Sequence, residues 1–254
     1  MPEAPPQRPL LDSVAVITGG GGGIGRAIAH RLAAAGGKLI LTYNQDKEKA
    51  TTVAEALDGD GHAVMQASVT DSKALSALAS TIAQRYGTID ILVNNAGTTR
   101  IVDHGNLDGL DDQLIDDIFR TNWRGAFACV RAFRPLLERR DGSLVVNISS
   151  IAGTTAIGSN IAYCASKAAM NSMTQSLARS LAPKIRVVSV APGWVEGDDA
   201  NRADPSYLKD QIAKTPLGRI ARPKDIGEAV HALATGLQFT TGTILPIDGG
   251  RPLN

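Results

Sequence analysis

Val14-Ala15-Val16-Ile17-Thr18-Gly19-Gly20-Gly21-Gly22-Gly23-Ile24-Gly25 is the stretch that decides the fold. Its apolar, largely β-branched beginning predicts a buried strand, and the alanine-rich segment from Ile24 to Ala35 predicts a helix. Glycines between a strand and a helix let the backbone approach a pyrophosphate, whose charge is favoured by the helix N-terminus. The stretch therefore predicts a dinucleotide site, with a merely tight or flexible turn as the alternative. Because the glycines follow one another without a break, spacing alone leaves the register of the motif open.

Short apolar runs and longer alanine-rich segments alternate along the rest of the chain. Further strands are predicted at residues 38–43, 63–67, 89–93, 144–148, 185–190 and 243–247, and further helices at residues 47–57, 71–86, the second half of 109–138, 161–181 and 223–236. This alternation predicts an α/β fold, a Rossmann-type three-layer sandwich with a seven-stranded parallel sheet flanked by helices on both faces. Residues 194–222 are the least regular stretch, and we expect them to form a substrate lid.

Composition limits the classes of protein to consider. The chain has 254 residues, 43% of them hydrophobic, and a net charge of +1, which suits an α/β domain and gives no basic footprint for nucleic acid. Without a linker-like change in composition, we expect one domain over residues 13–254 after an N-terminal tail, residues 1–12. No apolar run is long enough for a membrane span, and the proline-rich start does not resemble a signal peptide. Cys129 and Cys164, the only cysteines, form no C-x-x-C pair, which favours a cytoplasmic location over a disulfide framework.

Polar and glycine-containing segments follow several predicted strands: Asn94-Asn95-Ala96-Gly97, Ser149-Ser150 and Pro192-Gly193. Ligands bind at the carboxyl ends of the strands in such sheets. Tyr163 and Lys167 stand four residues apart in a predicted helix, so they share one face. A neighbouring ammonium favours a phenolate and so suits a tyrosine for acid–base chemistry, whereas the alternative is a chance Tyr-x-x-x-Lys spacing.

In this combination the chain resembles the classical branch of the short-chain dehydrogenase/reductase family, from Ser13 to Gly250. Thr18-Gly19-x-x-x-Gly23-Ile24-Gly25 is similar to the cofactor loop of that family, which settles the register. Asn94-Asn95-Ala96-Gly97 resembles its motif that steadies the central strand, and Pro192-Gly193 its turn beside the nicotinamide.

The resemblance implies a catalytic tetrad and a reversible transfer of hydride between nicotinamide C4 and a carbonyl or secondary alcohol carbon. Tyr163 would exchange a proton with the substrate oxygen, and Lys167 would support Tyr163 and hold the nicotinamide ribose. Ser150 would hydrogen-bond the substrate oxygen. Asn122 would position a water that links Lys167 to solvent. Ser149 is the rival to Ser150, and the family spacing of thirteen residues before the tyrosine selects Ser150.

The resemblance also implies which residues contact the cofactor. They are Gly19, Gly22, Gly23, Ile24, Tyr43, Asn44, Ser68, Val69, Asn95, Ala96, Gly97, Tyr163, Lys167, Pro192, Gly193 and Val195. NAD-specific relatives usually carry an acidic residue at the end of the second strand, where this chain has Tyr43-Asn44. The absence of that acid allows the 2′-phosphate of NADP, although no arginine stands there and Gly22 replaces the basic residue found in some NADP users. NADP is the favoured cofactor and NAD the alternative.

The chain departs from the family pattern at two places. Ser68-Val69 stands where Asp-Val is common, so the adenine contact is weaker or made by backbone. Gly197 stands where a threonine often bonds the carboxamide, so nicotinamide orientation must depend on the Val195 backbone.

Gly97-Thr98-Thr99-Arg100 resembles the corresponding stretch of 3-oxoacyl carrier-protein reductases, which favours an NADPH-dependent ketoreductase acting on a small-molecule carbonyl. The alternatives are an NAD-dependent sugar, polyol or alcohol dehydrogenase, and a catalytically silent dinucleotide-binding regulatory protein. Similar family members form dimers through such apolar helices and complete tetramers through the last strand, so a homotetramer is predicted. The helix residues concerned are Ala126, Phe127, Val130, Phe133, Ala168, Ala169 and Met173. The histidines are scattered and predict no metal site.

Overall fold

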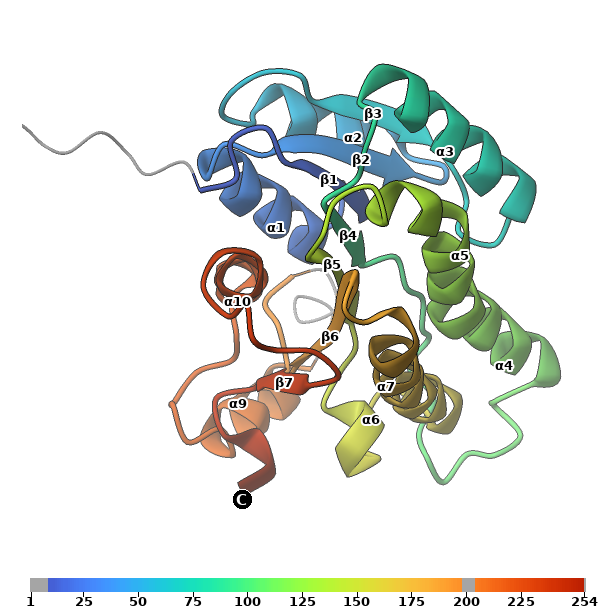
Figure 1. The fold of residues 1–254 in the computed structure, drawn as a ribbon. Coiled ribbons are helices and arrows are strands. Elements are labelled where there is room, and N and C mark those ends of the chain that lie inside the picture. The colour runs from blue at the N-terminus through green and yellow to red at the C-terminus, as the bar shows by residue number, and fades with distance from the viewer. Residues whose placement is uncertain (1–8, 198–203, 254) are drawn as a thin grey trace, which may run out of the picture.

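The computed structural model describes residues 9–197 and 204–253 (Figure 1). Its centre is one seven-stranded parallel sheet with the strand order β3-β2-β1-β4-β5-β6-β7. The strands are β1 (Val14–Thr18), β2 (Lys38–Tyr43), β3 (Ala63–Gln66), β4 (Ile91–Asn94), β5 (Ser143–Ile148), β6 (Ile185–Pro192) and β7 (Ile244–Ile247). The strand order reverses between β1 and β4, and in such sheets this is where a ligand crevice opens.

Helices cover both faces of the sheet, which confirms the predicted Rossmann-type sandwich (Figure 1). One face packs against α1 (Gly23–Ala34), α2 (Lys47–Glu55) and α10 (Pro223–Thr235). The other packs against α3 (Ser72–Arg85), α5 (Ala126–Leu137) and α7 (Ile161–Leu181), with α4 (Asp112–Phe119) alongside α7. Alternate residues of β1 serve the two layers, since Ile17 packs with Ile28 of α1 while Val16 packs with Phe133 of α5.

Local capping chemistry sets several helix boundaries. Asp71 caps α3 by accepting hydrogen bonds from two backbone N–H groups, and Asn160 caps α7 through the N–H of Tyr163 at 2.7 Å. Pro223 is the first residue of α10. Gly87, with φ of +80°, follows the end of α3, where the left-handed conformation favours glycine.

The stretch predicted to be irregular contains a helix, α9 (Pro205–Ala213). Asp204 caps it through the N–H groups of Ser206 and Tyr207, and Pro205 occupies the first helical position. The stretch was expected to be the least regular of the chain, and no helix was predicted in it. Within that stretch, residues 198–203 lie outside the described residues. Three short elements were also not predicted: a π-helix η1 (Arg120–Gly125), α6 (Ala152–Thr155) and a 3-10 helix η2 (Arg251–Leu253).

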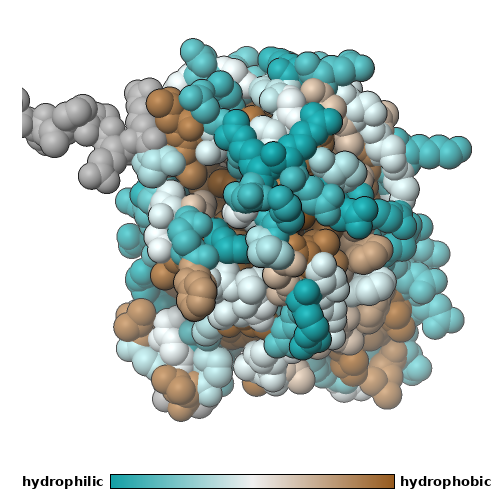
Figure 2. Space-filling model, in the orientation of Figure 1, coloured by the Kyte–Doolittle hydropathy of each residue, from teal (hydrophilic) through white to brown (hydrophobic). Residues whose placement is uncertain are grey.

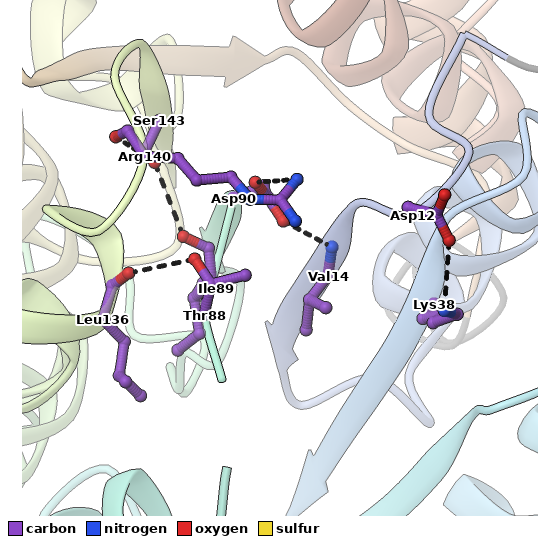
Figure 3. Close-up of polar contacts among 9 residues, drawn as sticks. All are labelled: Asp12, Val14, Lys38, Thr88, Ile89, Asp90, Leu136, Arg140 and Ser143. Carbon is purple, nitrogen blue, oxygen red and sulfur yellow. Dashed lines mark hydrogen bonds and ion pairs between the residues drawn. The ribbon is translucent and has the colours of Figure 1, made fainter. Parts of the chain in front are cut away.

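Asp90 connects neighbouring segments at the amino-terminal ends of the strands, opposite their carboxyl ends (Figure 3). Its carboxylate accepts a hydrogen bond from the N–H of Val14 at 2.7 Å and forms an ion pair with Arg140 at 3.3 Å. The Asp90 side chain is only 15% exposed, so solvent screens its bond to Val14 little, whereas its ion-pair partner Arg140 is 52% exposed. A second acid in the same view, Asp12, pairs with Lys38 at 3.4 Å but is 73% exposed.

The described part of the predicted tail, residues 9–12, lies on the fold. Leu10 is buried in the cluster beneath α1, and its N–H bonds the carbonyl oxygen of Ala35 at 3.0 Å. Hydrophilic and hydrophobic groups are interspersed on the face drawn in Figure 2. None of the helices in the described residues has the length and apolar character needed to cross a bilayer.

Candidate active site

The glycine run turns the chain from β1 into α1, and its members fall into two groups. A side chain at Gly20 or Gly25 would collide with the protein, because its Cβ would lie 2.9 Å from Leu41 or 2.6 Å from a loop carbonyl oxygen. At Gly23, in contrast, a Cβ would meet nothing within 4 Å, and at Gly22 it would meet only a carbonyl oxygen at 3.6 Å. Both are exposed, and α1 begins there without a side-chain cap. The uncapped N–H groups of this turn suit an anion.

Thr18 and Asn95 join this loop to the end of β4. The Asn95 side-chain amide donates to the carbonyl oxygens of Thr18 and Gly19, both at 3.0 Å. The Thr18 hydroxyl accepts from the N–H groups of Asn95 and Ala96, also at 3.0 Å. Ala96 lies against Gly19, where a Cβ would be 3.3 Å from the Ala96 Cα. The Asn-Asn-Ala-Gly motif thus steadies the glycine loop across the point where the strand order reverses.

Asn122 lies in the π-helix η1, a rare wide turn that is frequent at functional sites. Its side chain is fully buried and bonds both backbone groups of Thr98, accepting from N–H at 2.8 Å and donating to the carbonyl at 3.0 Å. It also donates to the Ser166 hydroxyl at 3.1 Å. Val69 supports the turn from outside, since a Cβ on Gly125 would lie 2.7 Å from its side chain. These bonds fix the amide between the end of β4 and helix α7.

Tyr163 and Lys167 share one face of α7, with the Lys167 Nζ 5.5 Å from the centre of the Tyr163 ring. Lys167 is buried, and its Nζ donates to the carbonyl oxygen of Ile148 at 2.8 Å. Burial lowers the pKa of Lys167 to about 8, because desolvation disfavours the ammonium. Gly97 closes the gap to Asn122: a Cβ there would be 3.9 Å from the Lys167 Nζ and 3.3 Å from the Asn122 Oδ1.

Ser149 and Ser150 follow β5 and have different surroundings. The Ser149 hydroxyl is buried and bonds the Asn171 Oδ1 at 2.7 Å. The Ser150 hydroxyl is half-buried, accepts from the N–H of Ala152 at 3.1 Å, and lies 3.5 Å from the carbonyl oxygen of Pro192. A contact of that length is a weak hydrogen bond, so the Ser150 proton is available to another acceptor.

The residues expected near the adenosine follow β2 and β3. Tyr43 ends β2 and is half-buried, while Asn44 is exposed and its carbonyl oxygen accepts from the Gln66 side chain at 3.0 Å. Ser68 follows β3, and its hydroxyl lies 2.9 Å from that of Thr70. No acidic side chain occupies the end of β2.

The segment after β6 leads from the site into the stretch predicted to be the lid. Gly193 packs against Asp248, where a Cβ would lie 3.1 Å from the Asp248 Cα, and Val195 is bridged to Ala221. In this bridge the N–H of Glu196, the residue after Val195, donates to the carbonyl oxygen of Ala221 at 2.8 Å. Trp194 is half-buried and meets Tyr207 of α9 edge-on, with ring centres 5.8 Å apart.

The predicted site residues therefore lie along the carboxyl edge of one sheet, in two groups. The catalytic tetrad and the segment after β6 gather around the ends of β4, β5 and β6, and the adenosine-side residues lie at β1, β2 and β3. Sequence reasoning missed Asn171, which bonds Ser149, and two residues of α9, Tyr207 and Gln211, which contact Trp194 and Arg251. Asp204-Pro205 was the signal that could have revealed the lid helix. Within residues 9–197 and 204–253, no group of three or more potential ligands is placed to hold a metal ion.

Known proteins resemble the chain over nearly its whole length. A family profile described as enoyl-(acyl carrier protein) reductase matches residues 19–251. A Streptomyces violaceoruber protein, named as ketoacyl reductase 2 of the granaticin polyketide synthase, is 35% identical, with 99% of this chain and 98% of that protein aligned. The 3-oxoacyl-(acyl-carrier-protein) reductase FabG of Staphylococcus aureus is 33% identical over 93% of this chain and 96% of its own.

Among solved structures, a Brucella melitensis protein described as a short-chain dehydrogenase/reductase, glucose/ribitol dehydrogenase, superposes with a TM-score of 0.89. It is 30% identical, with 96% of this chain and 98% of that chain covered. Sequence and structure lead to the same group of enzymes. The chain belongs to the short-chain dehydrogenase/reductase family of oxidoreductases, whose members generally use NAD(P).

Proposed function

We propose that the protein is an NADPH-dependent ketoreductase of the 3-oxoacyl-reductase type. The observation that carries the proposal is the buried ammonium of Lys167, 5.5 Å from the centre of the Tyr163 ring. Ser150 follows β5, and Asn122 of η1 bonds the backbone that follows β4. The names of two relatives, a ketoacyl reductase and a 3-oxoacyl-(acyl-carrier-protein) reductase, support this substrate class.

The residues present fit a dinucleotide. Gly22 and Gly23 are exposed, their missing side chains leave open space, and α1 begins beside them without a side-chain cap. A pyrophosphate there would accept hydrogen bonds from the backbone N–H groups. Lys167 would hold the nicotinamide ribose, because an ammonium has three N–H donors and Ile148 accepts one. When bound, NADPH supplies the hydride.

The chain's own residues would handle the proton and the developing charge. Tyr163 gives its phenolic proton to the substrate oxygen during reduction and takes it back during oxidation. The Ser150 hydroxyl, held in place by the N–H of Ala152, donates to the same oxygen and stabilises charge where it develops. Asn122 holds the water that returns a proton toward Lys167, with its amide fixed by Thr98 and Ser166.

The preference for NADPH rests on the end of β2. Tyr43 and Asn44 offer no carboxylate to accept bonds from a ribose 2′-hydroxyl or to repel a 2′-phosphate. The N-terminus of α2 lies beside the glycine loop, since a Cβ on Gly21 would be 3.0 Å from the N–H nitrogen of Ala50. Lys49 of this turn pairs with Asp46 at 3.3 Å, and both side chains are largely exposed.

The second candidate function is an NAD-dependent sugar, polyol or alcohol dehydrogenase. The Brucella melitensis structure favours it, because that protein is described as a glucose/ribitol dehydrogenase. Steady-state assays with each cofactor against a 3-oxoacyl thioester, a 3-oxoacyl ester, glucose, ribitol and simple secondary alcohols separate the two. We expect kcat/KM to be highest for 3-oxoacyl reduction with NADPH. A higher kcat/KM for sugar or polyol oxidation, or a tenfold tighter Kd for NADH, would contradict the proposal.

We also propose that residues 13–254 form one domain, that residues 194–222 act as its substrate lid, and that the protein is a cytoplasmic homotetramer. Most apolar residues that suggested the tetramer pack internally, Phe133 and Val130 among them. Phe127 remains 36% exposed and stacks on Trp123 with ring centres 6.1 Å apart, leaving an aromatic surface on α5. Multi-angle light scattering tests the assembly, and a stable monomer at micromolar concentration would refute it.

A further inference from the structure

Ser149 links the strand that carries Ser150 to the helix that carries Tyr163 and Lys167. Its hydroxyl lies 2.7 Å from the Asn171 Oδ1 and 3.3 Å from the backbone carbonyl oxygen of Lys167. The residue is 3% exposed. Because a hydroxyl has one proton, the donor is shared between these two acceptors of α7.

Lys167 is held at three points by this corner of the fold. Its Nζ bonds the carbonyl oxygen of Ile148, and its own carbonyl oxygen faces the Ser149 hydroxyl. On the third side α6 presses on its backbone: a Cβ on Gly153 would lie 2.7 Å from the Lys167 carbonyl carbon. Both ends of the lysine are therefore tied to the segment that runs from β5 into α6.

Asn171 is an unexpected residue at its position. It stands one helical turn after Lys167, is 8% exposed, and its side-chain nitrogen has no hydrogen-bond partner among the described residues. Asparagine is a weak helix former, and an unsatisfied buried amide is unfavourable. Helix formation and packing thus give no reason for this residue, whereas its oxygen makes the short contact to Ser149.

We propose that Ser149 and Asn171 are positioning residues that hold the Lys167 backbone against the end of β5, so that its ammonium stays beside the Tyr163 ring. Asn171 orients the Ser149 hydroxyl, and Ser149 fixes the turn of α7 on which Lys167 stands. The consequence for catalysis rests on the proposed function. The mechanical part does not, because it concerns the backbone of Lys167 whatever the substrate.

Thr174 provides a matched control. It lies on the same helix, is fully buried, and bonds Asn147 of β5 at 2.9 Å, so it makes the same kind of contact two turns beyond Lys167. Thr174→Val removes a buried hydroxyl between β5 and α7 that also bonds the carbonyl oxygen of Met170 at 2.9 Å, but it removes no contact to Lys167 itself. A merely structural role for Ser149 predicts that Ser149→Ala and Thr174→Val have similar consequences.

The experiment compares Ser149→Ala, Asn171→Leu, the double variant and Thr174→Val. We expect Ser149→Ala to lower kcat for 3-oxoacyl ester reduction by roughly tenfold to a hundredfold, as a small misplacement of a catalytic group does. Asn171→Leu should lower kcat less, because Ser149 still has the Lys167 carbonyl as acceptor, and the double variant should match Ser149→Ala. Thr174→Val should keep kcat within about twofold of the native value. Its loss of thermal stability should be similar to that of Ser149→Ala.

Hydrogen exchange measured by mass spectrometry tests the mechanical part without turnover. The peptide that contains residues 163–171 should exchange faster in Ser149→Ala than in Thr174→Val. Equal exchange and equal kcat losses in these two variants would overturn the proposal, as would a native kcat in Ser149→Ala. If Ser149→Ala does not fold, Asn171→Leu against Thr174→Val decides in the same way. A native protein that reduces no ketone refutes the proposed function alone, and the exchange comparison still decides the positioning role.

Discussion

The ammonium of Lys167 donates a hydrogen bond to the carbonyl oxygen of Ile148, 2.8 Å away at the last residue of β5. One carbonyl oxygen replaces little of the hydration that the charge loses on burial, which is why the pKa of Lys167 falls to about 8. A buried charge at this position opposes folding, while the proposed function requires it for the reaction. Activity and stability are therefore in conflict at one side chain.

Replacing Lys167 with Met should stabilise the protein at pH 7 and abolish turnover. The pKa falls from 10.5 to about 8 on folding, which corresponds to roughly 3 kcal/mol against the folded state wherever the lysine is charged. The variant also leaves the Ile148 carbonyl oxygen without its hydrogen-bond donor, which reduces the expected stabilisation by about 1 kcal/mol. We expect a net gain of about 1–3 kcal/mol at pH 7, measured by urea unfolding.

The sign of the pH dependence follows from the same shift. Below pH 8 both states carry the proton and the native protein bears the full penalty; between pH 8 and 10.5 only the unfolded chain keeps it, so native stability rises with pH. The advantage of Lys167→Met should therefore shrink as pH increases through this window. An advantage that stays constant from pH 7 to 10 would contradict the burial of a charged lysine.

Tyr163→Phe should remove the proton donor and leave the rest of the site intact. We expect kcat to fall by about 10²–10⁴. The Kd for NADPH, measured by fluorescence titration, should stay within about threefold, less than 1 kcal/mol. Tyr86→Phe is the control, because the Tyr86 hydroxyl bonds the carbonyl oxygen of Gly61, which precedes β3 and so lies away from the carboxyl ends of the strands. Normal turnover in Tyr163→Phe would refute the assigned role.

Gly23→Ala and Gly25→Ala should have opposite effects on the free protein. A Cβ at Gly23 meets nothing within 4 Å, so alanine is expected to stabilise the start of α1 by about 0.5–1 kcal/mol. It would still stand where the pyrophosphate approaches, and we expect the Kd for NADPH to rise about tenfold, or 1.4 kcal/mol. A Cβ at Gly25 would lie 2.6 Å from a carbonyl oxygen, so that variant should lose about 1–3 kcal/mol of stability.

Calorimetry of the free protein and cofactor titration measure both glycine variants. If Gly23→Ala binds NADPH as tightly as the native protein, the cofactor does not approach the loop backbone there.

Asp90→Ala should destabilise the fold without changing catalysis. The variant leaves the N–H of Val14 and the Arg140 guanidinium without a partner at a position 15% exposed, and we expect a loss of about 1–3 kcal/mol. Asp12→Ala removes the ion pair with Lys38, in which the Asp12 side chain is 73% exposed. We expect this variant to change the free energy of unfolding by less than about 1 kcal/mol. Chemical unfolding measures both, and kcat/KM should stay at the native value in each. Equal losses in the two variants would contradict the role given to Asp90.

Arg251→Leu should weaken substrate binding through the lid. Arg251 donates to the Gln211 side chain of α9 at 3.1 Å, and Gly249 lies against the end of that helix, where a Cβ would be 2.6 Å from Thr215. Loosening α9 should raise KM for the ketone by up to about tenfold, with kcat and the Kd for NADPH little changed. Arg85→Leu, which removes an arginine lying 5.1 Å over the Tyr86 ring, is the control. An unchanged KM in Arg251→Leu would show that the C-terminal segment does not support the lid.

The sequence was most informative where one local rule decides the structure. Asp71 and Gly87 mark the two ends of α3 by capping and by a left-handed turn, and neither needs a distant partner. The glycine run was readable for the same reason, since a strand on one side and a helix on the other restrict what the loop between them can do. Motif spacing then selected the four predicted catalytic residues, although only Ser150 follows a strand, since Asn122 lies in η1 and the tyrosine and lysine lie in α7.

Features that depend on distant contacts were beyond sequence reasoning. Asn171 bonds Ser149, 22 residues earlier, and nothing near Asn171 announces it. The π-helical turn depends on the close contact of Gly125 with Val69, which lies in the turn between β3 and α3. The lid helix is a different case: Asp204 and Pro205 are ordinary helix-start signals, but scattered charge and further prolines hid them. Apolar Val130 and Phe133 suggested a subunit contact because sequence does not reveal which face of a helix the sheet will cover.

The π-helical turn η1 makes the directions of the side chains in residues 112–137 depend on the exact number of residues in this helical segment. Residues 112–137 form a nearly continuous rod of roughly 40 Å, in which adding or removing a residue turns every later side chain by about 100°. A π-turn absorbs such a rotation within itself, so Asn122 reaches Ser166 while Phe133 still points into the sheet. Two helical segments with different angular registers are thereby joined end to end. One carries Asn122, to which the proposed function gives a chemical role, and the other packs on the sheet. A relative with one residue fewer in this rod would present another side chain at the same place, however closely its remaining sequence matched.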